Sequence, residues 1–280
     1  MARAYYCLVA GFPDIALDEA KLPLTTDVLR ADLAEQLAPE DRQYLSMLFW
    51  PVDNRNLLAV LAGSPDHDAR GNYSREFLED EVRTPSALPG YMREFVDQYR
   101  AGLAAGAHPE NVLADLMYRE LAGCSNAFVR GWFEFDRDLR NIVAALGCRR
   151  TGAEPEREIV GDGLVAEAVR RTSGSDFGLS RELVWLDALL RGWGQSLLER
   201  ELAVDRIRLD VMDELTVSSG FSIDKVLAFV LRLGIAERWL ALDAATGREM
   251  LRRILSDMES GLVFPEEFSI RGGSKHGDNM

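Results

Sequence analysis

The residue types that most often carry catalysis are few in this chain and lie far apart. Its 280 residues include three histidines, of which His108 precedes a proline and His276 lies near the C-terminus. Neither position is typical of a general base. His67 stands between Asp66 and Asp68, and this triplet could hold a metal ion, although one histidine between loop carboxylates is more often solvated. The sequence therefore offers no evident pair of nucleophile and base.

Two short motifs match nucleotide-binding patterns but lack the neighbouring elements that such sites need. Residues 161–166 fit G-x-G-x-x-A, yet a dinucleotide site needs a buried strand directly before it, and residues 155–160 are too polar and too short. Residues 176–178 spell Asp-Phe-Gly, but the H-R-D loop and glycine-rich strand of a kinase are missing. We therefore predict no catalytic residue, no cofactor and no metal site.

The charge balance and the cysteines restrict the partners and the compartment. Lys and Arg number 32 against 46 Asp and Glu, a formal charge of −14, which argues against nucleic acid or an anionic membrane as the main partner. Cys7, Cys124 and Cys148 form no C-x-x-C pair, and reduced thiols fit the cytoplasm. The longest apolar stretch, residues 5–12, is much shorter than the ~20 residues of a membrane-spanning helix. We expect any membrane contact to be indirect.

Helical periodicity predicts an all-α fold. Apolar residues recur at helical spacing in four segments that each open with a capping residue or a proline: 25–37, 89–103, 109–121 and 125–146. Further helices are expected at 163–172, 180–202 and 205–217, with separate helices after Ser222 and Thr246. The weak strand candidates, residues 5–10 and 159–160, are too few to organise a sheet.

One internal repeat stands out. Asp53–Leu61 reads DNRNLLAVL and Asp138–Leu146 reads DLRNIVAAL, which gives the pattern D-x-R-N-[LI]-[LV]-A-[VA]-L at an offset of 85 residues. Each copy follows an aromatic segment and ends in a turn that contains glycine. Four identical polar or alanine positions and a final leucine favour duplication over a chance match of two amphipathic helices.

The polar residues of the repeat are the candidate site residues, and we predict a structural role for them. They are Asp53, Arg55 and Asn56 in the first copy and Asp138, Arg140 and Asn141 in the second. Asp and Asn three residues apart share a helical face beside the apolar stripe. Because each group heads an apolar segment, we expect these side chains to bind unpaired backbone groups at helix ends or to line an interface between modules.

The repeat and the loops predict that the chain is divided into related helical modules. Residues 1–150 would hold the two repeat-bearing modules, and residues 151–163, rich in charge and glycine, would form a linker. Residues 164–271 would form a C-terminal module, in which Ile223–Arg232 is a weaker third copy without the D-x-R-N head. Residues 272–280 are typical of a disordered tail. A chain of two or three such modules is suited to act as a scaffold.

These features resemble the C subunit, also called the d subunit, of the V/A-type rotary ATPases. The resemblance rests on Phe135–Ile142 and the first repeat copy, which join an aromatic segment to D-x-x-N-[LI], and on Lys225–Arg232, which looks like the C-terminal helix of that family. Tyr5–Asp14 and Arg70–Tyr73 resemble more closely an uncharacterised bacterial family encoded among V-type ATPase subunits. Compared with the C-subunit family, the chain is somewhat short and lacks the usual asparagine-rich continuation.

The resemblance implies an all-helical, funnel-shaped body that performs no chemistry. Members of the C-subunit family sit on the membrane rotor ring and receive the central shaft, so the implied partners are the shaft and rotor-ring subunits of a V-type ATPase. The implied location is the cytoplasm, peripheral to the inner membrane through those partners. Two alternatives stay open on the sequence: a helical enzyme with an unrecognised carboxylate or cysteine site, and a general helical adaptor.

Overall fold

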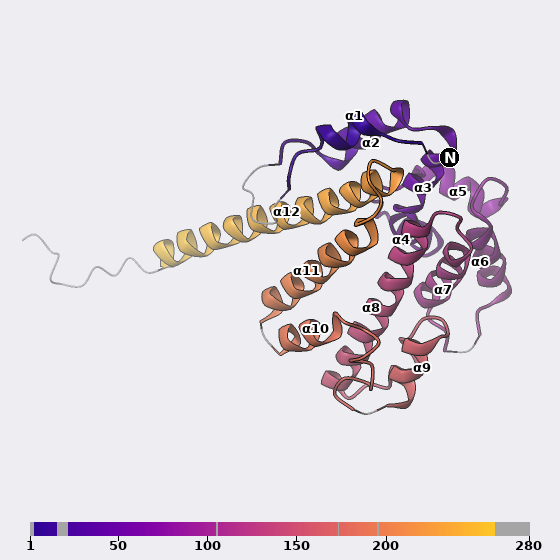
Figure 1. Ribbon diagram of the computed structural model, residues 1–280. Helices are drawn as coiled ribbons and strands as arrows, with labels where there is room; N and C mark the ends of the chain where they lie inside the picture. The colour runs from indigo at the N-terminus through magenta and orange to yellow at the C-terminus, as the bar shows by residue number, and fades with distance from the viewer. Residues whose placement is uncertain (1–2, 16–21, 105, 173, 195, 261–280) are drawn as a thin grey trace, which may run out of the picture.

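A computed structural model describes residues 3–15, 22–104, 106–172, 174–194 and 196–260, with side chains up to residue 242. Within these ranges it contains twelve α-helices and no strand, which confirms the all-α prediction (Figure 1). In chain order the helices are α1 (Tyr6–Gly11), α2 (Thr26–Gln36), α3 (Pro39–Met47), α4 (Trp50–Leu61), α5 (Arg75–Arg83), α6 (Gly90–Ala101), α7 (Pro109–Ala122), α8 (Ala127–Thr151), the 3₁₀ turn η1 (Pro155–Arg157), α9 (Leu164–Arg171), α10 (Leu186–Trp193), α11 (Leu197–Thr216) and α12 (Ile223–Ser260).

Local capping chemistry sets many of the helix ends. The side chains of Thr25, Ser74 and Asn126 accept backbone N–H groups at the starts of α2, α5 and α8. Pro109 occupies the first turn of α7, where its missing N–H costs no hydrogen bond. α8 ends at Gly152, whose φ of +73° lies in the left-handed region that glycine adopts without strain.

Several expected boundaries were wrong. Residues 5–10 do not form a strand, because Tyr6–Gly11 is the helix α1, and residues 159–160 form a buried loop. The expected helix 180–202 is interrupted after Gly194. Ser196 and Glu199 then form a reciprocal capping box that starts α11, which continues through the gap expected near residue 203.

The expected start of a separate helix at Thr246 was also wrong. Residues 223–260 contain no proline, and α12 continues as one helix from Ile223 to Ser260. The predicted cap of Thr246 by Glu249 lies outside the described side chains. Residues 272–280 and the end of the predicted C-terminal module lie outside the described residues altogether.

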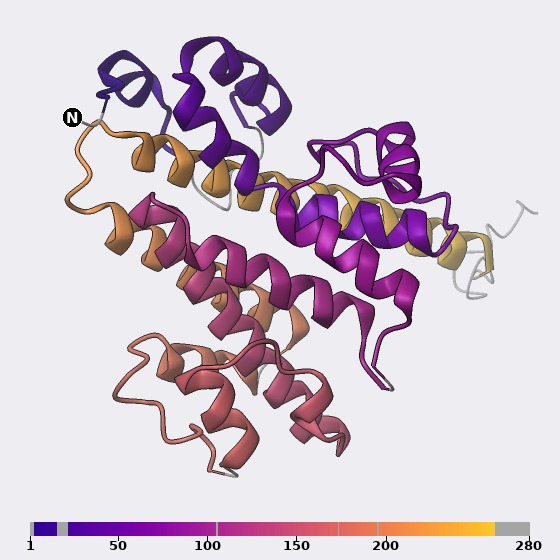
Figure 2. The same ribbon diagram turned by 90° about the vertical axis from the view of Figure 1, so that its right-hand side faces the viewer.

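α8 lies at the centre of the molecule. It packs against α7 on one side and against α9 and α11 on others, while α7 also packs against α4 and α6. α7 therefore lies between the two repeat helices, α4 and α8. α12 packs along α11 and α2 and contacts α1 and α3, and Figure 2 shows it running along the length of the molecule with α1–α3 beside it.

The buried apolar side chains form one continuous core. α8 supplies a large share of it, including Phe128, Trp132 and Ile142. Residues 151–163, predicted as a linker, send Ile159 and Val160 into the same core, where 6% and 1% of their surface is exposed. The division of the chain at this segment stays a prediction.

One buried carboxylate joins α11 to α12. Asp205 is fully buried and accepts a hydrogen bond from Arg208 at 2.9 Å and from the indole N–H of Trp239 at 2.7 Å. It also pairs with Arg238 of α12. A single buried charge that meets three donors on two helices fixes how these helices lie against each other.

We predict that Asp205→Ala lowers the free energy of unfolding by about 2–4 kcal/mol, because Arg208 and Arg238 would lose their buried anion. Chemical denaturation measures this change. The matched control is Asp210→Ala, an exposed aspartate on the same helix, which we expect to change stability by no more than about 0.5 kcal/mol. Equal effects of the two substitutions would contradict this role.

Candidate functional site

Both repeat helices carry an asparagine that binds the backbone of the loop after its helix. In α4, the amide of Asn56 donates to the carbonyl oxygen of Asp68 at 2.9 Å and accepts from its N–H at 2.8 Å. In α8, Asn141 makes the same two bonds to Val160, both at 2.9 Å. We call each arrangement an asparagine clasp. Both asparagine side chains are buried. Val160 is buried as well, so its clasp satisfies a backbone N–H and C=O that water does not reach, whereas Asp68, held by Asn56, is partly exposed.

The two clasps hold comparable loops. The loop bound by Asn56 leads into α5, which packs against α4. The loop bound by Asn141 leads into α9, which packs against α8. In both copies, the asparagine of the repeat thus donates to and accepts from the backbone of one residue in the loop before the next α-helix. This shared geometry supports the duplication that the sequence repeat predicts.

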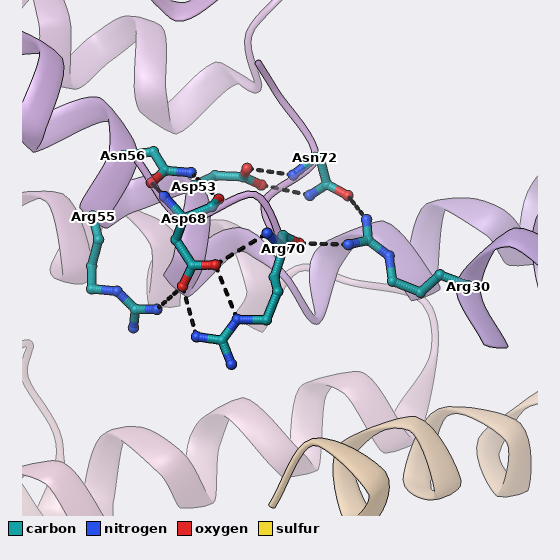
Figure 3. A network of polar contacts seen from close by, with 7 residues as sticks. All are labelled: Arg30, Asp53, Arg55, Asn56, Asp68, Arg70 and Asn72. Carbon is teal, nitrogen blue, oxygen red and sulfur yellow. Dashed lines mark hydrogen bonds and ion pairs between the residues drawn. The ribbon is translucent and has the colours of Figure 1, made fainter. Parts of the chain in front are cut away.

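The aspartates of the two copies differ in their surroundings. Asp53 is fully buried and accepts two hydrogen bonds from Asn72, one from the backbone N–H at 2.6 Å and one from the side-chain amide (Figure 3). The guanidinium of Arg30 donates to the side-chain oxygen of the same Asn72 at 3.1 Å. Asp138 instead pairs with its neighbour Arg137 at 2.9 Å. The aspartate therefore binds the following loop only in the first copy.

A glycine lets the loop approach α4 closely. A Cβ atom on Gly71 would lie 2.7 Å from Oδ1 of Asp53 and 2.8 Å from Nδ2 of Asn56. Both distances are shorter than real Cβ contacts, so a side chain at this position would displace either the loop or the side chains of Asp53 and Asn56. The Arg70–Tyr73 segment was visible in the sequence, but its contacts with the repeat were not predicted.

Two carboxyl groups in this network have strongly shifted pKa values. Burial raises the pKa of Asp53 to about 6, although the hydrogen bonds from Asn72 and the charge of Arg30 act in the opposite direction. Asp68 is the reverse case, because hydrogen bonds from Arg70 hold its pKa well below the usual range. Arg55 pairs with the same carboxylate at 3.1 Å. The Asp68 side chain, which the sequence offered as a metal ligand, is thus bound to two arginines.

The repeat arginines meet in a groove between the helices. Arg55 of α4 and Arg140 of α8 both line a cavity of about 230 Å³, as do Asn54 and Tyr118. Arg55 also lines a neighbouring cavity of about 340 Å³, which extends to α2, α11 and α12. We call the two cavities together the interhelical groove. The structure therefore brings one residue from each repeat copy to the same surface.

The groove presents both charges and aromatic rings. Its arginines are Arg55, Arg70, Arg140, Arg208 and Arg238, and its carboxylates are Glu110, Asp136 and Glu237. Phe49, Trp132 and Phe133 also line it, although each of these side chains is more than nine-tenths buried in the core. Most of these charges already have partners in the chain, such as Glu237, which accepts the backbone N–H of Thr26 at 2.7 Å. Such a surface suits a polar protein segment better than a small anion.

Two features are missing from the described part of the chain. It holds no group of three or more His, Cys, Asp or Glu placed to bind a metal ion. Among the same residues, no helix combines the length and the apolar character needed to cross a lipid bilayer.

Comparison with known proteins identifies one family. A family described as "Protein of unknown function (DUF2764)" matches residues 1–262 of the chain. No curated protein and no solved structure matches. The match covers the repeats, both asparagine clasps and the groove.

We predict that Asn141→Ala lowers the free energy of unfolding by about 2 kcal/mol, because it leaves a buried N–H and a buried C=O without partners. Asn56→Ala should lower it by about 1 kcal/mol, because the backbone of Asp68 is partly exposed and can bind water instead. Thermal or chemical unfolding measures the loss. Glu134→Ala, an exposed substitution on α8, controls for helix propensity. Variants that unfold like the parent would show that the clasps do not stabilise the fold.

We also predict a pH dependence that arises from Asp53. Its pKa of about 6 lies above the unfolded value of 3.8, so ionisation in the folded state opposes stability. The parent should lose about 3 kcal/mol relative to Asp53→Asn between pH 3 and pH 7, and the difference should then stay constant. Asp32→Asn, which removes an exposed carboxylate from α2, is the control for net charge. A difference that does not vary with pH would contradict the shifted pKa.

Proposed function

We propose, for a chain that belongs to the DUF2764 family of proteins of unknown function, a role as a non-catalytic assembly subunit of a V-type rotary ATPase, similar to that of the C subunit. In this role the protein connects the central shaft to the membrane rotor ring. It binds peripherally, on the cytoplasmic side, through those subunits.

The observation that carries the proposal is the pair of asparagine clasps. The D-x-R-N segments are the main residues through which the chain resembles the C-subunit family, which is built from similar helical modules. Asn56 and Asn141 make the same bonds to comparable loops. A duplicated helical module is what this resemblance implies.

The interhelical groove is the surface that we assign to the shaft. It is lined by residues of α2, α4, α7, α8, α11 and α12, so a segment bound there would contact most of the body at once. The walls are tied together by Asp205 and by the bonds between Glu237 and Thr26. Walls of close-packed helices joined by buried ion pairs resist deformation, as a part that transmits torque must.

The enzyme alternative has one observation in its favour, which is the raised pKa of Asp53. A carboxyl group that titrates near neutral pH can act as a general acid or base. Asp53, however, does not line the interhelical groove, and its carboxylate is bound by Asn72. This environment favours the structural role.

The proposal predicts that the tagged protein recovers rotor-ring and shaft subunits of the V-type ATPase from native membranes. Recovery of neither would contradict it. In Arg55→Glu/Arg140→Glu, reversed charges in the groove should reduce shaft recovery at least tenfold. Arg93→Glu, an exposed charge reversal on α6, is the control and should leave recovery unchanged. If the double variant melts normally and still recovers the shaft, the groove is not the docking surface.

A further inference from the structure

A larger cavity lies at the C-terminal end of α8, where it meets the end of α10 and the start of α11. Its volume is about 780 Å³, and none of its lining residues belongs to the interhelical groove. Three arginines line it: Arg149 and Arg150 of α8 and Arg200 of α11. Trp193 completes one wall. We call this cavity the arginine pocket.

Two of the three guanidinium groups are held in place by aromatic rings. Arg149 lies 3.7 Å from the ring centre of Phe177 and donates to the carbonyl oxygen of Thr172 at 2.9 Å. Arg200 lies 4.4 Å from the ring centre of Trp193. Its Nε is buried and has no acceptor among the described residues. Guanidinium groups fixed in this way lose little freedom when they bind a ligand.

The positions of the arginines along their helices distinguish them from ordinary helix-end charges. Arg149 and Arg150 lie in the last turn of α8, where a cation suits the negative end of the helix dipole. Arg200 lies near the first turn of α11, where a cation faces the positive end and is disfavoured. Helix electrostatics therefore do not account for Arg200, whereas an anion in the pocket would.

The pocket contains no compensating carboxylate in its wall, although the chain carries 46 acidic residues. Arg149, Arg150 and Arg200 form no ion pair within the described part of the chain. Glu199 lies next to Arg200 on α11, and its carboxylate, which accepts from the hydroxyl of Ser196 in the capping box at 2.7 Å, places one negative charge beside the pocket. The three arginines therefore leave the pocket with a net positive charge.

We propose that the arginine pocket binds a phosphate group that carries more than one negative charge, presented by a soluble phosphate compound or by a phospholipid headgroup. Guanidinium groups pair with phosphate oxygens through two parallel hydrogen bonds, and three arginines line this one cavity. This site is independent of the ATPase role, and either proposal can fail without the other.

The first test is titration calorimetry of the full-length protein with inorganic tripolyphosphate at low salt. We expect saturable binding to the parent, weakened at least tenfold in Arg150→Gln and further in Arg150→Gln/Arg200→Gln. The exposed side chain of Arg150 makes no hydrogen bond or ion pair with the described residues, so the single variant should fold normally. Arg206→Gln, which removes an exposed charge from the same helix as Arg200, is the control and should bind as the parent does.

The second test distinguishes the two sources of phosphate. Flotation with phosphatidic acid vesicles, whose phosphomonoester headgroup can carry two negative charges, compared with phosphatidylcholine vesicles, reports binding to such a headgroup. Tripolyphosphate binding without flotation assigns the pocket to a soluble ligand, and flotation that depends on Arg150 and Arg200 assigns it to a lipid. The proposal is overturned if the parent binds neither, or if Arg206→Gln weakens binding as much as Arg150→Gln does.

Discussion

The pairing of one asparagine amide with one backbone residue is the interaction on which the rest of the site depends. A polar loop that returns across the surface of a helix brings backbone N–H and C=O groups out of water, and each must find a partner. Asn56 and Asn141 supply a donor and an acceptor from a single side chain. Each loop is thereby fixed without a sheet, and the helix after it begins at a defined place on the repeat helix.

The clasp also explains why asparagine and arginine are adjacent in the repeat. Neighbouring residues on a helix point about 100° apart, so a helix that turns Asn56 towards its loop turns Arg55 towards a different surface. Arg55 is exposed and lines the interhelical groove, whereas Asn56 is buried. Arg140 and Asn141 divide their roles in the same way. The asparagine sets the rotation of the helix, and the arginine next to it is carried into the groove.

The sequence predicted the helical class and helix starts such as those at Thr25 and Pro109, because these depend on residues close together in the chain. It did not predict the partners of the repeat. Asp53 meets Asn72 across a loop whose path no periodic pattern defines, and Asp205 meets Arg238 on another helix. Local periodicity carries no information on such pairs. The break after Gly194 was missed although Ser196 and Glu199 spelled a capping box, because an apolar pattern on both sides suggested one helix.

The differences between the two copies are as informative as their likeness. Only in the first copy does the aspartate bind the following loop, through the backbone N–H of Asn72. There Gly71 lets the loop lie closer to α4 than a residue with a side chain would. That copy holds a buried charge whose ionisation near pH 6 opposes folding. Burial raises the pKa of Asp138 in the second copy as well, but there the adjacent charge of Arg137 acts against the rise. Asp53 therefore serves to orient the loop at Asn72 rather than to stabilise the fold. Because Asn72 binds Asp53 and Arg30 together, it links α4 to α2, and both helices contribute to the wall of the groove.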